Sequence, residues 1–172
     1  MNNLEAPKHR KQLRLKYYDY SQNGAYYVTI CTHNRINLFG KIINVGAHPC
    51  VRLSTAGAMI KKKLLDLEQK FPDVTVDYYC VMPNHLYFVL FKEGAHAGAP
   101  LHEIIKWYKT QTTNEYINLV RQGILPPFDK HIWQRNYYEH VIRGENDLYE
   151  IRKYIRDNPA KWFFDKYYQT KD

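Results

Sequence analysis

The sequence lacks several features that define specialised classes of protein. It has no CxxC pair, and its three cysteines (Cys31, Cys50 and Cys80) are widely spaced, which argues against a zinc site or a disulfide framework. It has no run approaching the roughly 18 to 20 apolar residues that a membrane span needs. Its first 20 residues have no apolar centre, so they do not resemble a secretory signal. We therefore expect a cytoplasmic protein with reduced thiols and no membrane partner.

Internal repeats and low-complexity segments are also missing, and 172 residues suffice for one compact domain with a buried core. We expect a single domain over residues 1–172, with a basic arm at 1–20 and an aromatic tail at 163–172. The arm either lies along a nucleic-acid backbone or is ordinary solvated surface. Its basic residues are Lys8, Arg10, Lys11, Arg14 and Lys16.

Positive charge and tyrosine are what the sequence has in excess. Lysine and arginine number 25 against 17 aspartates and glutamates, which gives a formal charge of +8, and there are 16 tyrosines. Positive charge attracts phosphate through counterion release, and aromatic rings can stack on unpaired bases. The same composition also suits a basic protein with a tyrosine-rich core. It therefore raises the expectation of a nucleic-acid partner without deciding it.

Hydrophobic periodicity predicts the elements of one fold. Short apolar or β-branched runs predict strands at 25–32, 74–81, 85–91 and 136–142. Helical spacing predicts a helix over 54–70, a second that follows Pro100 and ends before Gly123, and a third from Asp147 to Pro159. The order strand, helix, strand, strand, helix, strand, helix is typical of the α+β class. It predicts a ferredoxin-like, split βαβ antiparallel sheet with an additional C-terminal helix.

Two of these elements carry residues suited to chemistry. Alternation along 85–91 puts His85 and Tyr87 on one face of the strand, although a histidine at a strand start is commonly a structural residue. On the last helix Tyr154 and Asn158 are four residues apart, beside the apolar stripe. A tyrosine there has an anchored ring and a free hydroxyl, and Asn158 offers an oxygen to a hard cation. The alternative is a core tyrosine and a helix-ending asparagine.

Four stretches together resemble a known family. VMPNHLYFVL at 81–90 is similar to the VMPNHVHLL signature of REP-associated tyrosine transposases and their single-tyrosine HUH endonuclease relatives. Three further stretches agree with that family in content and order. They are YYVTICTHNRINLFG (26–40), WQRNYYEHVIR (133–143) and YIRDNPAKW (154–162).

The resemblance implies a metal-dependent DNA nickase and strand transferase. In that family a histidine pair holds a divalent metal (Mg²⁺ or Mn²⁺), and a helix tyrosine attacks a DNA phosphate to form a 5′-phosphotyrosine link. His85 matches the first histidine, Tyr154 the nucleophile and Asn158 the metal ligand on the helix. Tyr87 stands where the pattern has its second histidine, and a phenol is a poor ligand for these metals at neutral pH.

The departure at Tyr87 leaves several hypotheses open. The chain is either an active transposase that nicks single-stranded or hairpin DNA, or a transposase-derived DNA-binding protein with weakened or lost cleavage. A ferredoxin-like RNA-binding module is a third hypothesis. Both a monomer and a homodimer remain open.

Several basic and aromatic residues are predicted to contact DNA. Trp107 lies off the apolar stripe of its helix between two lysines, where it either stacks on a DNA strand or packs under the 93–100 loop. Arg35 follows the first strand and is a predicted phosphate contact. The complete set of predicted DNA contacts is Arg35, Lys106, Trp107, Lys109, Arg135 and His140.

Overall fold

The computed structural model describes residues 18–46, 48–94 and 98–169. The predicted basic arm therefore lies outside the described residues, apart from its last three positions. No helix in the described ranges is long and apolar enough to cross a lipid bilayer. The elements are β1 (Gly24–Cys31), η1 (His33–Arg35), β2 (Gly40–Val45), β3 (His48–Leu53), α1 (Thr55–Lys70), β4 (Val74–Val81), β5 (His85–Lys92), α2 (Leu101–Arg121), β6 (Tyr138–Ile142), α3 (Glu145–Asp157) and η2 (Asn158–Phe164).

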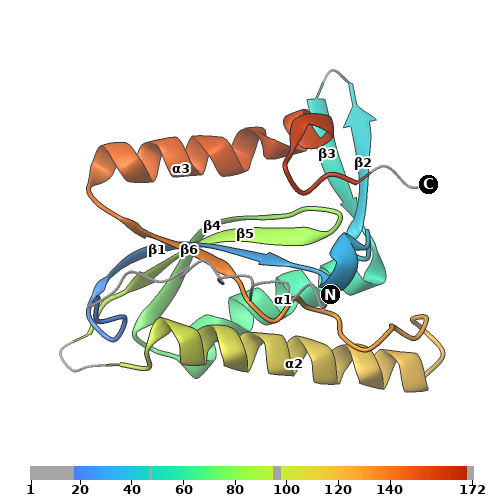
Figure 1. Cartoon of the computed structure of the whole chain (residues 1–172), viewed down its shortest axis with the longest axis horizontal. Coiled ribbons are helices and arrows are strands. Elements are labelled where there is room, and N and C mark those ends of the chain that lie inside the picture. Colours follow the sequence, from blue (N-terminus) through green and yellow to red (C-terminus); the bar gives the residue numbers. More distant parts are fainter. Residues whose placement is uncertain (1–17, 47, 95–97, 170–172) are drawn as a thin grey trace, which may run out of the picture.

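A four-stranded antiparallel sheet in the order β4-β5-β1-β6 forms the centre of the fold (Figure 1). This order, with α1 between β1 and β4 and α2 between β5 and β6, is the split βαβ arrangement, so the predicted α+β fold is confirmed. The register pairs Cys31 with His85 and Thr29 with Tyr87. The start of β5 therefore lies beside the end of β1 at one end of the sheet.

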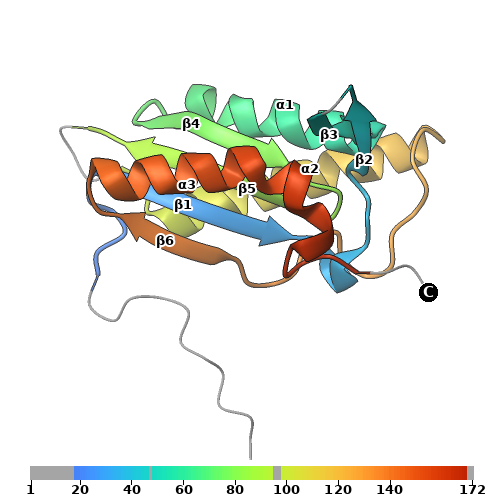
Figure 2. The same ribbon diagram turned by 90° about the horizontal axis from the view of Figure 1, so that it is seen from above.

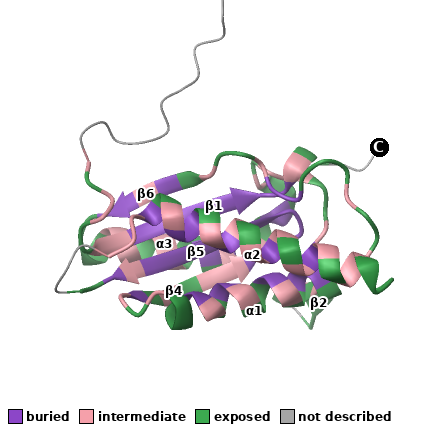
Figure 3. Ribbon diagram, turned by 90° about the horizontal axis from the view of Figure 1, so that it is seen from below, coloured by how far each residue is buried: buried purple, intermediate pink, exposed green. Residues whose placement is uncertain are grey.

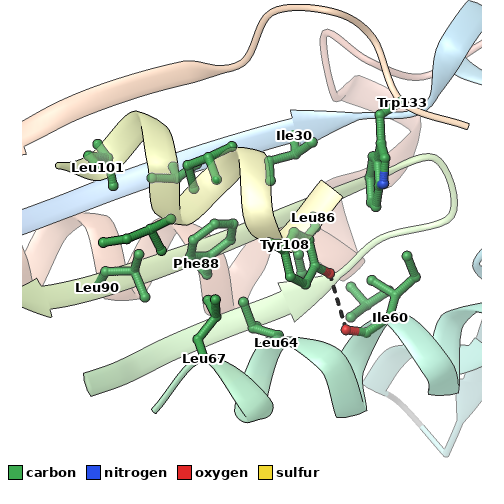
Figure 4. Packing of buried hydrophobic residues seen from close by; sticks show 14 of the residues in the cluster. Ile30, Ile60, Leu64, Leu67, Leu86, Phe88, Leu90, Leu101, Tyr108 and Trp133 are labelled. Atoms are coloured by element: carbon green, nitrogen blue, oxygen red, sulfur yellow. Dashed lines mark hydrogen bonds between the residues drawn. The ribbon is translucent and has the colours of Figure 1, made fainter. Parts of the chain in front are cut away.

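Helices α1 and α2 pack on one face of the sheet and bury the main core. Leu86, Phe88 and Leu90 of β5 point into it and are fully buried with the apolar stripe of α1 (Figure 4). The Tyr108 hydroxyl of α2 donates a 3.1 Å hydrogen bond to the Ile60 carbonyl of α1, which satisfies the polar atom of a buried ring. Strand alternation thus sends the even-numbered side chains of β5 to this core, as the sequence predicts.

Helix α3 covers the opposite face of the sheet, as Figures 1 and 2 show. Its residue Ile155 packs with Tyr87 and Val89 of β5 and with Trp162 of η2 in a second buried cluster. Both faces of the central strands are therefore covered, and Figure 3 shows β1 and β5 buried along most of their length. Covering the second face explains why residues 85–90 are all buried.

A separate hairpin of β2 and β3 is a feature that the sequence did not predict. It pairs residues 40–45 with 48–53 and lies at the end of the sheet where β5 begins (Figure 1). Gly46, with a positive φ of 61°, supplies the left-handed turn conformation that glycine adopts readily. Helix α3 also begins at Glu145, two residues before the predicted start. Asp147 accepts hydrogen bonds from the Arg143 backbone N–H and from His140 and so holds the start of this helix to β6.

Candidate active site

His85 is held at the start of β5 by its neighbour Asn84. The His85 ring is fully buried, and its Nδ1 lies 2.8 Å from the Asn84 side-chain oxygen. An amide oxygen can only accept, so Nδ1 carries the hydrogen and Nε2 keeps its lone pair. The orientation of Asn84 is fixed in turn, because its Nδ2 donates to the carbonyls of Arg35 (3.0 Å) and Tyr167 (2.8 Å).

The Nε2 atom of His85 faces a carboxylate. No hydrogen-bond partner for it is found within the part of the chain that the structure describes. The nearest acid is Asp165, whose Oδ2 is 3.8 Å away, and the side chains of His85 and Asp165 are 0% and 1% exposed. Burial, with smaller contributions from Lys166 and Arg35, lowers the pKa of His85 to about 3. The imidazole is therefore neutral at physiological pH, which is the form that binds metals.

Tyr87 links the strand to helix α3. Its hydroxyl donates to Asp165 Oδ2 over 3.0 Å and lies 3.2 Å from the hydroxyl of Tyr154. Because the Tyr87 hydrogen points to the carboxylate, Tyr154 is the donor in the tyrosine pair. Burial and the hydrogen bond with Tyr154 raise the pKa of Tyr87 far above its usual range, so this phenol stays protonated. It serves as a hydrogen-bonding group rather than as an anionic ligand.

Tyr154 combines contact with this cluster and access to solvent. Its ring packs edge to face against Tyr87, and its side chain is 44% exposed. The ring of His85 also packs against Tyr87, with centroids 4.3 Å apart. The predicted nucleophile and the predicted metal ligand therefore contact the same side chain. The structure thus brings together the last helix and the start of β5.

Asn158 lies one turn after Tyr154, at the start of η2. It is 3% exposed, and its Nδ2 donates to the Tyr154 backbone carbonyl over 3.3 Å. That hydrogen bond uses the amide nitrogen and not the side-chain oxygen that would bind a cation. The described contacts do not join Asn158 to His85 directly.

Tyr154 opens onto a surface hollow of about 500 Å³. Lys166 lines the same hollow, and its Nζ lies 5.3 Å from the centroid of the Tyr138 ring. A cation and the exposed ring of Tyr138 next to a tyrosine hydroxyl are suited to a phosphate and a neighbouring base. The lining residues are Tyr27, Tyr138, His140, Glu150, Ile151, Tyr154 and Lys166.

Comparisons with known proteins identify the family of this chain. A family profile described as "Transposase IS200 like" matches residues 20–158. The chain belongs to the IS200-like transposase family. The resemblance seen in the sequence is thereby confirmed.

Individual relatives include two proteins of Haemophilus influenzae. An uncharacterised protein is 33% identical over 172 residues, covering 93% of each chain. One named as a candidate REP-associated tyrosine transposase is 30% identical over 90 residues, covering 48% of this chain and 47% of its own.

Two solved structures share the fold of this IS200-like family member. A REP-associated tyrosine transposase bound to a REP hairpin has a TM-score of 0.62 at 20% identity, covering 91% of this chain and 77% of its own. A candidate transposase from Deinococcus radiodurans has a TM-score of 0.51 at 16% identity, covering 84% and 95%.

Arg35, His140 and Arg135, three of the predicted DNA contacts of this family member, lie in three different places. Arg35 lies at the site, where its Nη1 donates to the Lys166 carbonyl over 3.0 Å. His140 lines the hollow beside Tyr154, but its Nε2 is also 2.8 Å from Asp147 Oδ2. Arg135 is exposed and lines a different hollow of about 430 Å³ near the end of α2, together with Lys109.

The Lys106, Trp107 and Lys109 trio does not share one surface role. Lys109 donates to the carbonyl oxygens of residues 134, 135 and 136 at 2.9, 3.3 and 3.3 Å, so it braces the segment before β6. Trp107 packs edge to face on Phe71, with ring centroids 5.8 Å apart. Lys106 is exposed beside Glu103.

The donor atoms around His85 suit a divalent metal only in part. Within residues 18–46, 48–94 and 98–169, no three side chains of histidine, cysteine, aspartate or glutamate gather in a cluster. The lone pair of His85 Nε2 and the buried oxygen of Asp165 are nevertheless donors that Mn²⁺ accepts. A sparse site at His85 is therefore compatible with the residues present.

Sequence reasoning missed the contribution of the C-terminal segment. Asp165, Lys166 and Tyr167 were expected only as part of an aromatic tail. A signal was present in the run WFFDKYY (162–168), which holds an acid and a lysine among five aromatic residues. So many aromatic residues are unusual in a solvated tail and indicate a segment that packs on the domain. Their contacts with Tyr87, the Tyr154 hollow and Asn84 make the segment part of the site.

Proposed function

We propose that the chain is a single-strand DNA endonuclease and strand transferase that uses Tyr154 as its nucleophile. One observation carries the proposal. The Tyr154 side chain is 44% exposed beside a hollow, while its hydroxyl is 3.2 Å from Tyr87 in the cluster around His85. Tyr154 is thus both held in orientation and accessible from the hollow. Membership of a transposase family supports the same chemistry.

The reaction exchanges one phosphoester bond for another. The Tyr154 oxygen attacks the phosphorus of a backbone phosphodiester, the tyrosine–phosphorus bond forms, and the bond to the 3′ oxygen breaks. The Tyr154 proton, which is donated to the Tyr87 oxygen before the reaction, is released to solvent as the new bond forms, and the departing 3′ oxygen takes a proton from solvent. Because the 5′-phosphotyrosine keeps the bond energy, a second 3′-hydroxyl can attack it and join the strands.

Positive charge is needed for this step, because a phenol is a weak nucleophile at neutral pH. Lys166 lines the hollow next to Tyr154 and supplies charge where the phosphate would enter. Mg²⁺ or Mn²⁺ held by His85 and Asn158 would polarise the scissile phosphate as a Lewis acid. Tyr87 keeps its proton and accepts the hydrogen bond that orients Tyr154.

The proposed substrate is single-stranded or hairpin DNA. A phosphate that reaches Tyr154 must enter the hollow with its neighbouring bases unpaired, and the 41% exposed Tyr138 lines that hollow as a stacking surface. The structural relative bound to a REP hairpin supports a hairpin as the first substrate to test.

A covalent adduct tests the proposal directly. Hairpin-bearing single-stranded DNA with an unpaired flank, incubated with the protein and Mn²⁺, should give a protein–DNA band on a denaturing gel. Tyr154→Phe should abolish that band, at least a thousandfold in rate by analogy with loss of other covalent nucleophiles. Tyr149→Phe is the matched control, because Tyr149 is a 61% exposed tyrosine on the same helix. An adduct that survives Tyr154→Phe would exclude this nucleophile.

A DNA-binding protein without cleavage is the second candidate. It is favoured by Tyr87, a buried phenol in the place of an expected metal ligand. In that case the hairpin would shift the protein on a native gel but give no adduct with any divalent metal. A stronger affinity for an RNA hairpin than for the DNA hairpin of the same sequence would favour the RNA-binding alternative instead.

A further inference from the structure

Two electron-pair donors face each other inside the protein, His85 Nε2 and Asp165 Oδ2. His85 Nε2 carries a lone pair, because Asn84 accepts the hydrogen on Nδ1. Asp165 Oδ2 is an acceptor 3.8 Å away, and both side chains are buried. Two such atoms repel each other unless a positive species lies between them. The arrangement is the one expected of a cation site.

We infer that Asp165 is the second protein ligand of a divalent cation bound at His85 Nε2. It takes the part that a histidine at position 87 would have played. The inference adds a metal ligand to the proposed active site, and its relevance to DNA cleavage rests on the proposed function. Asp165 lies beyond residues 20–158, the part of the chain that matches the family profile.

The separation of the two atoms suits a shared cation. Divalent metals lie roughly 2.1 Å from nitrogen and oxygen ligands. Two such bonds span at most roughly 4.2 Å, so a cation can bond to both atoms across the observed 3.8 Å. Tyr87 donates to the same Asp165 oxygen over 3.0 Å, which is the hydrogen-bonded support that metal-binding carboxylates receive.

The backbone around Asp165 is held in place for this role. Its Oδ1 accepts from the Tyr167 N–H over 2.7 Å, and its own N–H donates to the Trp162 carbonyl over 3.0 Å. Trp162 is 5% exposed in the cluster beneath α3, and Asn84 ties the Tyr167 carbonyl to the start of β5. The carboxylate is therefore fixed against His85 before any cation binds.

Manganese binding without DNA tests the inference. Calorimetric titration of the full chain with MnCl2 should show a site that Asp165→Asn weakens by roughly ten to a hundredfold. The matched control is Asp157→Asn, which removes a carboxylate paired with Arg156 at the surface and should change the affinity less than twofold. Adding Tyr87→His to Asp165→Asn should recover most of the lost affinity, because an imidazole then replaces the carboxylate.

A change of metal preference guards against a purely structural effect. Asp165→Cys replaces a hard oxygen by a soft sulfur and should raise the ratio of Cd²⁺ to Mn²⁺ affinity at least tenfold. That ratio does not depend on how much of the variant is folded. An unchanged ratio, equal losses in Asp165→Asn and Asp157→Asn, or no Mn²⁺ binding by the wild type would each overturn the inference.

The two proposals fail separately. If the DNA adduct requires Tyr154 but Mn²⁺ affinity is unchanged in Asp165→Asn, the nuclease proposal is supported and Asp165 is excluded as a metal ligand. If Mn²⁺ binding requires Asp165 but no hairpin gives an adduct, the metal site is supported and the nuclease proposal is excluded.

Discussion

The two faces of the sheet are built from the same strands but have different contents. The face under α1 and α2 receives Leu86, Phe88 and Leu90 of β5, all fully buried among aliphatic and aromatic side chains. The face under α3 receives His85 and Tyr87, whose side chains hydrogen-bond to Asn84, Tyr154 and Asp165. The face under α1 and α2 therefore contributes most of the hydrophobic core, whereas the face under α3 holds polar side chains in fixed positions.

This difference can be tested at neighbouring positions of β5. Phe88→Ala should lower the free energy of unfolding by about 3 to 5 kcal/mol, because it removes a fully buried ring from the main core. Tyr87→Phe keeps its ring and should cost only about 1 to 2 kcal/mol for its hydrogen bonds with Tyr154 and Asp165. Urea denaturation followed by circular dichroism measures both. Equal losses would show that the two faces do not differ in this way.

Adduct formation should show the opposite order. Measured at a temperature where both variants are folded, Phe88→Ala should react at nearly the wild-type rate. Tyr87→Phe should react more slowly, since it removes the acceptor that orients Tyr154. If Phe88→Ala is the slower variant, the main core contributes to the site in a way that the contacts do not reveal.

Ile155 should contribute both to stability and to adduct formation, unlike Phe88 and Tyr87. It is fully buried and is the inward anchor of α3, one residue after Tyr154. Ile155→Ala should lower the free energy of unfolding by about 2 to 4 kcal/mol and also slow adduct formation, because the helix that carries the nucleophile loses its anchor. Leu65→Ala, at a 42% exposed position on α1, is the control and should change neither. Normal adduct formation in folded Ile155→Ala would show that other contacts suffice to hold α3.

The sequence predicted the elements with strong local patterns. Alternation along β5 correctly separated Tyr87 from Leu86 and Phe88. The helix predicted over 54–70 is α1, and Ser54 caps it, since its Oγ accepts from the Gly57 N–H over 3.1 Å. The β2–β3 hairpin was missed because the periodicity of a short, partly exposed strand is weak, and its pairing depends on a turn at Gly46.

The site itself was predictable only in part. His85, Tyr154 and Asn158 could be named as candidates from the sequence, because each lies in a stretch that resembles the family. Asp165 could not be found in that way, because its contact with Tyr87 spans 78 positions of sequence and depends on how η2 turns back after α3. An irregular segment has no periodic pattern in its sequence, so its long-range contacts cannot be predicted from periodicity.

The smallest expected effect concerns the outer edge of α3. Arg152 forms a bidentate pair with Asp77 of β4, at 2.7 and 2.6 Å, but its side chain is 42% exposed, so solvent screens the pair. A double-mutant cycle with Arg152→Met and Asp77→Asn should give a coupling of roughly 0.5 to 1 kcal/mol, the upper range for an exposed pair with good geometry. Arg156→Met is the control, because Arg156 pairs with its sequence neighbour Asp157 at the surface and not with the sheet in the described residues. Since Ile155 already anchors α3, adduct formation should fall less than twofold in Arg152→Met. A tenfold fall would mean that this surface pair, and not the buried cluster, sets the position of Tyr154.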